Sequence, residues 1–127
     1  MKAALWQAAI CALALALAAC SQFREPIKLA SGKTVDVVGL HWQVLVSTGQ
    51  PTHHIYTITY VTKLPLNPDK LRPEADEVWR YYQPSVGAGY DIVVIEAITE
   101  PSGGFIKQYR SYRFMHERTT SGWREQD

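Results

Sequence analysis

Four histidines are the residues of this chain whose type could bind a metal ion: His41, His53, His54 and His116. Imidazole is the commonest protein ligand for such ions. The spacing gives little support to a site, because the chain contains no His-Glu-x-x-His sequence. His53 and His54 are adjacent, so their side chains would point to opposite faces of a strand. The sequence therefore predicts no metal site and no cofactor.

Paired carboxylates could supply the acid and the base of a glycosidase. Asp91 and Glu96 fall in one predicted strand but differ in parity, so they would face opposite sides. Glu74, Asp76 and Glu77 have another explanation, because acids near the start of a helix stabilise its positive end. No serine lies in a Gly-x-Ser-x-Gly sequence. We therefore predict no catalytic residue and expect that the protein is not an enzyme.

The segment from residue 105 to 117 interleaves basic and aromatic side chains on both faces of a predicted strand. Arginine and aromatic residues are enriched where proteins bind one another. The alternative is an edge strand that its charges protect from aggregation. We predict that the partner-binding residues are Arg110, Tyr112, Arg113, Phe114 and Trp123.

The N-terminus carries a different kind of chemistry, centred on Cys20. Lys2 precedes an apolar run over residues 8–19, which ends in Leu-Ala-Ala directly before Cys20 and Ser21. A positive residue, a short apolar run and small residues before a cleavage site make a signal peptide. The sequence at residues 17–20 resembles the lipobox of bacterial lipoprotein precursors. The resemblance implies cleavage after residue 19 and lipidation of the Cys20 thiol. The alternatives are a plain signal peptide or an uncleaved membrane helix.

This resemblance sets the expected location and composition of the mature chain. Ser21 after the lipidated cysteine favours the outer membrane, although a lipoprotein of a single-membrane organism would carry the same lipobox. Cleavage would remove Cys11 and lipid would occupy Cys20, so no disulfide could form within the monomer. Twelve basic and twelve acidic residues remain after residue 19, and this balance argues against a nucleic-acid partner. The expected partners are the membrane, through the lipid, and another envelope protein.

The expected domain order is a cleaved signal at residues 1–19, a tether at 20–26, one α+β domain at 27–118 and a tail at 119–127. The polar residues 21–25 would lift the domain only about 15–20 Å from the membrane. A first hairpin is predicted around Ser31-Gly32-Lys33. Alternation from Val38 then predicts a half-buried strand. Its apolar face would consist of Val38, Leu40, Trp42, Val44 and Val46.

Later elements complete the predicted fold. A second strand is expected over residues 54–63, and a helix from Pro73 to about Tyr82 with a stripe of Leu71, Ala75, Val78, Trp79 and Tyr82 that packs on a sheet. Residues 90–99 read as an inner strand, and the turn at 101–104 leads into the last strand. The predicted fold is a small antiparallel sheet of four to five strands with one helix on a face, in the order (β)ββαββ.

Three functions are compatible with these features. The first is a non-enzymatic protein-binding or accessory module of the envelope, such as a secretion or assembly helper or an immunity-type inhibitor. The second is a ligand-binding domain or hydrolase for envelope or cell-wall material, which would require a concave pocket with converging polar groups. The third is a structural envelope protein.

Overall fold

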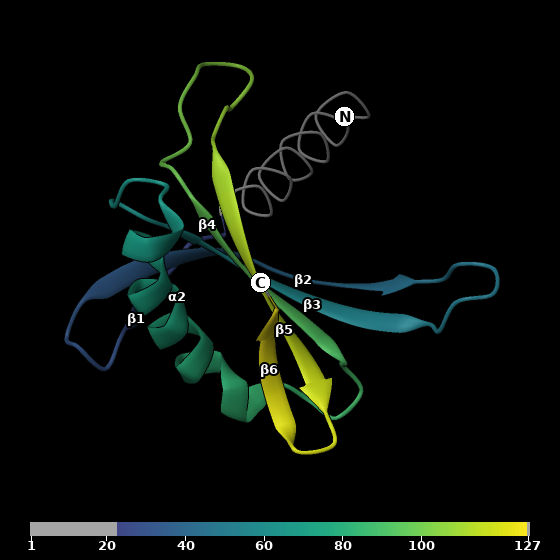
Figure 1. The fold of residues 1–127 in the computed structure, drawn as a ribbon. Helices are drawn as coiled ribbons and strands as arrows, with labels where there is room; N and C mark the ends of the chain where they lie inside the picture. The colour runs from purple at the N-terminus through teal and green to yellow at the C-terminus, as the bar shows by residue number, and fades with distance from the viewer. Residues whose placement is uncertain (1–22, 127) are drawn as a thin grey trace, which may run out of the picture.

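The computed structural model describes residues 23–126, which form one sheet with a helix packed against it (Figure 1). The helical segments are α2 (Pro68–Tyr82) and the short 3₁₀ helix η1 (Gln83–Ser85). The strands are β1 (Glu25–Lys28), β2 (Thr34–Leu45), β3 (His53–Val61), β4 (Ile92–Ile98), β5 (Ser111–Thr119) and β6 (Gly122–Gln126). The predicted α+β class is confirmed.

The sheet has six strands in the order β1-β2-β3-β4-β5-β6, which is also their order along the chain. Every neighbouring pair is antiparallel except β3 and β4, which are parallel. Parallel neighbours require a long crossover, and the segment containing α2 provides it. The prediction of a purely antiparallel sheet of four to five strands is therefore wrong in strand number and in the direction of this central pair.

Two boundaries near the C-terminus also differ from the prediction. Residues 119–127 were expected to form a tail, yet Gly122–Gln126 is strand β6, paired with β5. The last long strand was expected from residue 105, yet β5 begins at Ser111. Residues 99–110 instead form a long connection between β4 and β5, called here the 99–110 loop.

Helix α2 begins earlier than the prediction, which placed its start at Pro73. The side chain of Asn67 caps the helix by accepting a hydrogen bond of 3.0 Å from the backbone N–H of Asp69. Pro68 occupies the first turn, where a missing N–H costs nothing. Pro73 lies inside the helix. The capping signal at Asn67 therefore sets the start of this helix.

The main core lies between α2 and one face of the sheet. The predicted helix stripe is confirmed, because all five of its side chains are buried. On the sheet side the core draws on every strand from β1 to β5. Its sheet residues are Ile27, Val35, Val37, Ile58, Tyr60, Val93, Ile95, Ala97 and Phe114.

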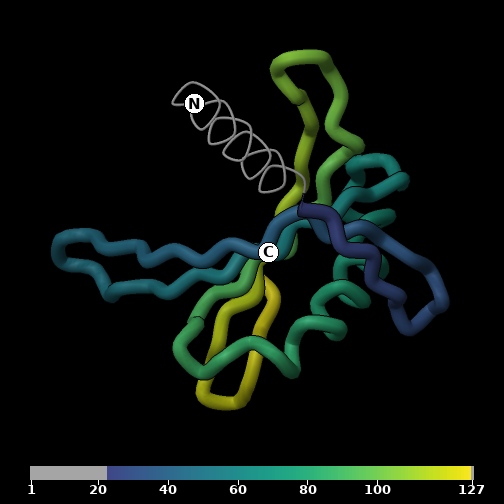
Figure 2. Tube along the Cα trace, turned by 180° about the vertical axis from the view of Figure 1, so that it is seen from behind, coloured from purple at the N-terminus to yellow at the C-terminus, as the bar shows by residue number. Residues whose placement is uncertain are grey.

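The outer parts of β2 and β3 extend well beyond this core. We call residues 40–54 the β2–β3 arm. Figures 1 and 2 show the arm projecting from the body as a long hairpin, away from α2. A twelve-residue strand is about 40 Å long, whereas the fifteen residues of α2 span about 22 Å. The helix therefore covers only part of the length of β2.

Candidate functional site

The β2–β3 arm carries a strip of exposed apolar side chains. Leu40, Trp42 and Val44 alternate along β2 and so share one face, and they are 40%, 64% and 44% exposed. Leu40 pairs with the buried Ile58, which shows that this is the same face that α2 covers nearer the centre. The sequence predicted that these side chains are buried. That prediction is wrong, because the outer part of β2 runs past α2 (Figures 1 and 2). The register shift between Val37 and Gly39 keeps these side chains on the helix face, but no described helix reaches them there.

The same arm also leaves part of its backbone unpaired. β1 pairs with β2 only as far as Val37, so residues 38–45 have β3 on one side and no described strand on the other. An open strand edge of this kind can accept another strand through main-chain hydrogen bonds. The turn of the arm, residues 47–52, is polar. The arm therefore offers an apolar side and an open edge, and it ends in a polar turn beside the exposed Leu45 and Val46.

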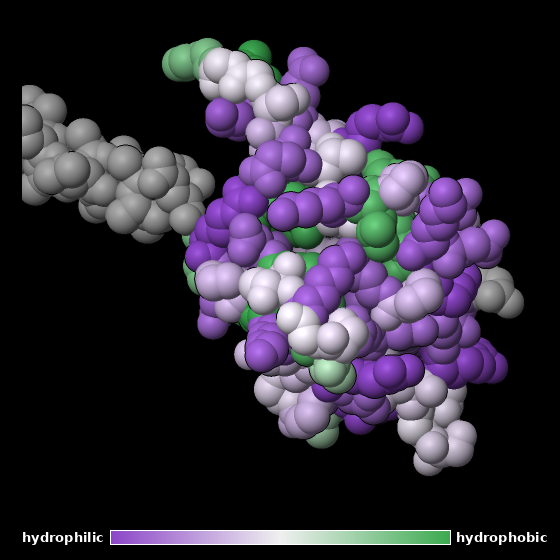
Figure 3. Space-filling model, turned by 90° about the vertical axis from the view of Figure 1, so that its left-hand side faces the viewer, coloured by the Kyte–Doolittle hydropathy of each residue, from purple (hydrophilic) through white to green (hydrophobic). Residues whose placement is uncertain are grey.

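A second projection, the 99–110 loop, presents apolar side chains at its tip. Phe105 is fully exposed, and Ile106 and Tyr109 are 73% and 55% exposed. Two backbone hydrogen bonds between Ser102 and Gln108, of 2.9 and 2.7 Å, close the base of the tip. Figure 3 shows hydrophobic atoms at the end of the molecule where this loop projects, above a mostly hydrophilic helix side.

The five predicted partner-binding residues do not form one surface. Phe114 is only 4% exposed and belongs to the core, while Tyr112 and Trp123 are partly buried against it. Arg113 lies on the opposite face of the sheet, where its Nε donates a hydrogen bond of 2.6 Å to Glu96. Arg110 is exposed at the end of the 99–110 loop. Phe114 therefore cannot contribute to an exposed surface in this structure.

Trp123 belongs instead to an aromatic cluster between α2 and the C-terminal strands. Trp79 stacks on His116 with ring centroids 4.7 Å apart and meets Trp123 edge-on at 5.2 Å. The guanidinium of Arg118 lies 4.3 Å from the centre of the Trp123 ring, a cation–π contact. Burial lowers the pKa of His116 below its ordinary value of 6.5. These contacts attach β5 and β6 to the helix.

A charged groove of about 600 Å³ runs beside α2 and the turn between β1 and β2. Glu74, at one wall, is 4% exposed and accepts hydrogen bonds from Thr62, at 2.7 Å, and from Lys33. Glu77 accepts two hydrogen bonds of 2.9 Å from Ser31. These acids therefore fasten the helix to the β1–β2 turn and to the end of β3.

Two of the four histidines contact Asp91, His53 through its side chain and His54 through its backbone. The Asp91 carboxylate lies 2.5 Å from Nδ1 of His53 and accepts a hydrogen bond of 2.6 Å from the backbone N–H of His54. Partial burial acts to raise the pKa of Asp91, but these hydrogen bonds outweigh it, so the pKa lies below its ordinary value. Within residues 23–126 no three histidine, cysteine or acidic side chains are placed to hold a metal ion.

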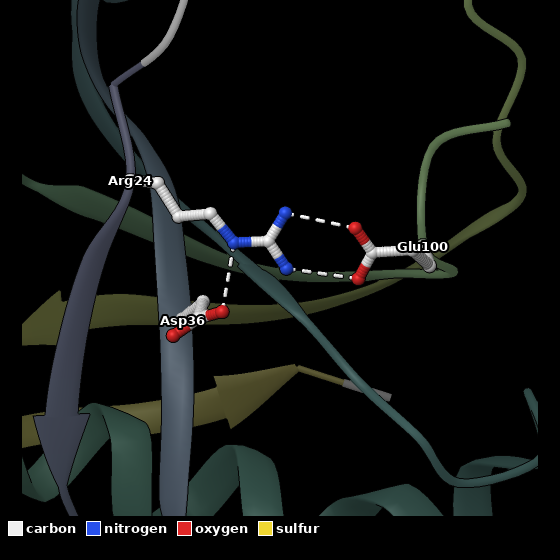
Figure 4. A network of polar contacts seen from close by, with 3 residues as sticks. All are labelled: Arg24, Asp36 and Glu100. Carbon is white, nitrogen blue, oxygen red and sulfur yellow. Dashed lines mark hydrogen bonds and ion pairs between the residues drawn. The ribbon is translucent and has the colours of Figure 1, made fainter.

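An ion-pair network ties the start of the described chain to the base of the 99–110 loop (Figure 4). Both terminal nitrogens of Arg24 donate hydrogen bonds of 2.8 Å to Glu100, and its Nε donates one of 2.7 Å to Asp36. The hydrogen bonds from Arg24 lower the pKa of Glu100. Because two parallel hydrogen bonds join the Arg24 guanidinium to the Glu100 carboxylate, they fix the orientation of the two groups as well as the distance between them.

Cys20, the predicted lipidation site, lies outside the described residues. Among the described helices none is long and apolar enough to span a membrane. Comparison with known proteins finds no matching protein-family model, no similar curated protein and no similar solved structure.

Proposed function

We propose that this chain is a lipid-anchored bacterial envelope protein that acts as a non-enzymatic protein-binding or accessory module, through its β2–β3 arm. The observation that carries the proposal is the exposed apolar strip of Leu40, Trp42 and Val44 on a projecting hairpin. Fully burying such side chains contributes about 1.5–3 kcal/mol each. Because these side chains are already partly covered, a partner that covers the strip would gain the share of this free energy that belongs to their exposed area.

The composition of the strip favours a protein partner. Tryptophan is enriched among the residues that dominate protein–protein binding, and Trp42 stands between two aliphatic side chains. The open edge of β2 adds hydrogen-bond donors and acceptors beside the strip. We infer that the partner lays an extended segment or a flat apolar surface along this side of the arm.

The location is supported by the N-terminal sequence. The lipobox-like residues 17–20 would place the domain on a lipid anchor, with the outer membrane favoured by Ser21. Two acyl chains on one thiol suffice for stable anchoring. The partner is then another protein of the same envelope.

Photo-crosslinking in the native envelope tests the binding surface. A photoreactive phenylalanine derivative replaces Trp42 in the full chain, and a matched control replaces Tyr81, which is 50% exposed on the helix. We expect a stoichiometric protein adduct at position 42 and none at position 81. Adducts at neither position, or at position 81 alone, would contradict the proposed surface.

The anchor is tested separately. We expect mass spectrometry of the N-terminal peptide to find Cys20 as the acylated first residue, and Cys20→Ser to leave the chain unlipidated and uncleaved. An unmodified Cys20 thiol in the wild-type protein would refute the lipid anchor without bearing on the arm.

A further inference from the structure

The 99–110 loop is built to hold apolar side chains at its tip. The backbone bridge between Ser102 and Gln108 leaves Phe105 and Ile106 at the turn, where both are largely exposed. The Lys107 ammonium donates a hydrogen bond of 3.1 Å to the carbonyl of Gly103 across the turn. The tip is therefore held in shape before it meets any partner.

The charged side chains at and after the tip of the loop are all basic. Residues 101–110 contain Lys107 and Arg110 and no acid. Glu100, the acid just before them, lies at the base of the loop and is paired with Arg24, which Asp36 shares. An apolar tip flanked by basic residues matches the interface of an anionic bilayer, where apolar groups enter the acyl region and cations meet the headgroups.

The chain also brings this loop close to the expected anchor. The chain from Arg24 to Cys20 is four residues long and can reach at most about 14 Å. Arg24 is clamped to Glu100, and Phe105 is five residues beyond Glu100, within about 18 Å. The expected anchor and the apolar tip are thus each only a few residues of chain from one ion pair.

We infer that the tip of the 99–110 loop, with Phe105 and Ile106, inserts into the surface of the membrane that holds the lipid anchor. The inference rests on the proposed anchor at Cys20. It makes the loop a second attachment point, which fixes the orientation of the domain on the bilayer. The arm is the poorer match to an anionic bilayer: Leu45 and Val46 are exposed beside its turn, but the turn itself is polar and residues 40–54 contain no lysine or arginine.

A fluorescent label at the tip tests the inference. Phe105→Cys in the lipidated full chain carries an environment-sensitive fluorophore, and Thr48→Cys at the exposed turn of the arm is the control. Each protein is reconstituted in vesicles of phosphatidylethanolamine and phosphatidylglycerol that contain nitroxide-labelled lipid. We expect blue-shifted emission and several-fold stronger quenching at position 105 than at position 48.

Three outcomes would overturn the inference. If position 105 behaves like position 48 while mass spectrometry shows an acylated Cys20, the membrane contact fails and the anchor stands. If Cys20 is not acylated, the anchor and the membrane contact fail together. Emission that is blue-shifted in native membranes but unquenched by lipid in the vesicles would show that a protein covers the loop instead.

Discussion

At the scale of single residues, the surroundings decide what a side chain does. With a helix start predicted at Pro73, Glu74 has the type and position of an acid that stabilises the start of a helix. Because α2 begins at Pro68, Glu74 lies beyond the first turn. In the structure it is buried, and it joins the helix to Thr62 and Lys33. Removing its carboxylate would leave the Thr62 hydroxyl without this partner, which costs about 1–3 kcal/mol. Its main role is therefore to attach α2 to the sheet.

His116 makes the stability of the protein depend on pH. Because burial lowers its pKa below 6.5, the folded protein binds a proton there less tightly than the unfolded chain does. Asp76 and Glu125 act to raise this pKa and Arg72 acts to lower it further, but burial is the largest effect. The free energy of unfolding should therefore fall as the pH drops below 6.5, until the pKa of the folded protein is reached.

Urea denaturation above and below pH 6.5 checks this expectation. We expect His116→Gln to remove part of the decrease, because glutamine does not titrate. His41→Gln is the control, since His41 is exposed on β2. If the His116→Gln protein loses as much stability on acidification as the wild type, His116 is not a source of the pH dependence.

At the scale of elements, Gly103 determines the shape of the 99–110 loop. Its φ is +113°, and a Cβ at this position would lie 2.4 Å from the carbonyl oxygen of Ile106. Both the backbone conformation and the close approach exclude a larger residue without a shift of the turn. The bridge between Ser102 and Gln108 depends on this geometry.

We therefore expect Gly103→Ala to open the tip. Such strain costs about 1–3 kcal/mol, and a surface loop relieves it by rearranging locally. The amides of Ser102 and Gln108 should lose protection from hydrogen exchange while the core strands keep theirs. Gly104→Ala is the matched control, because an added Cβ there meets nothing within 4 Å. Unchanged protection in the Gly103→Ala protein would contradict this role of the glycine.

Periodicity predicted much of the element content but not what covers each face. The helix stripe that includes Leu71 and Val78 was identified because a 3.6-residue period has one natural explanation. Alternation at Leu40 and Trp42 correctly indicates a strand with one apolar face. Whether a helix reaches that face depends on tertiary geometry, which alternation does not encode. The exposed Trp42 was missed for this reason.

Other differences have equally local causes. β6 was assigned to a tail because its residues, such as Arg124 and Glu125, are polar at the edge of the sheet. The long strand expected from Phe105 fails because Gly103 and the Ser102–Gln108 bridge turn the chain back first. The predicted binding residues Arg113 and Phe114 do not share a surface, because adjacent strand residues face opposite sides of the sheet.

At the scale of the whole molecule, the described chain divides into a core and two projections. No residue of the β2–β3 arm belongs to the main core cluster. The 99–110 loop also contributes none of its side chains to that cluster. The residues proposed to contact a partner or the membrane are thus separate from the residues that form the main core.

This separation predicts that the arm can be shortened without unfolding the protein. Replacing residues 46–52 with Asn-Gly joins Leu45 to His53, which are paired across the ladder, and keeps the contacts of His53 and His54 with Asp91. We expect the free energy of unfolding to change by less than about 1 kcal/mol, the usual range for changes outside the core. Crosslinking from position 42 should persist, because Leu40, Trp42 and Val44 stay in place. A loss of several kcal/mol in urea denaturation would show that the arm supports the fold.

The parallel contact between β3 and β4 has a consequence for how the chain folds. On each side of this contact lie three strands that pair with their neighbours in sequence, β1 to β3 and β4 to β6. Each of these meanders forms from contacts that are near in sequence, apart from the longer 99–110 connection. Joining the two meanders brings together the ends of the segment from residue 62 to 91. The chain loses conformational entropy in closing this segment before β3 and β4 gain any free energy from pairing. We expect the slowest step of folding to be the pairing of β3 with β4, which joins the two meanders through the crossover that contains α2.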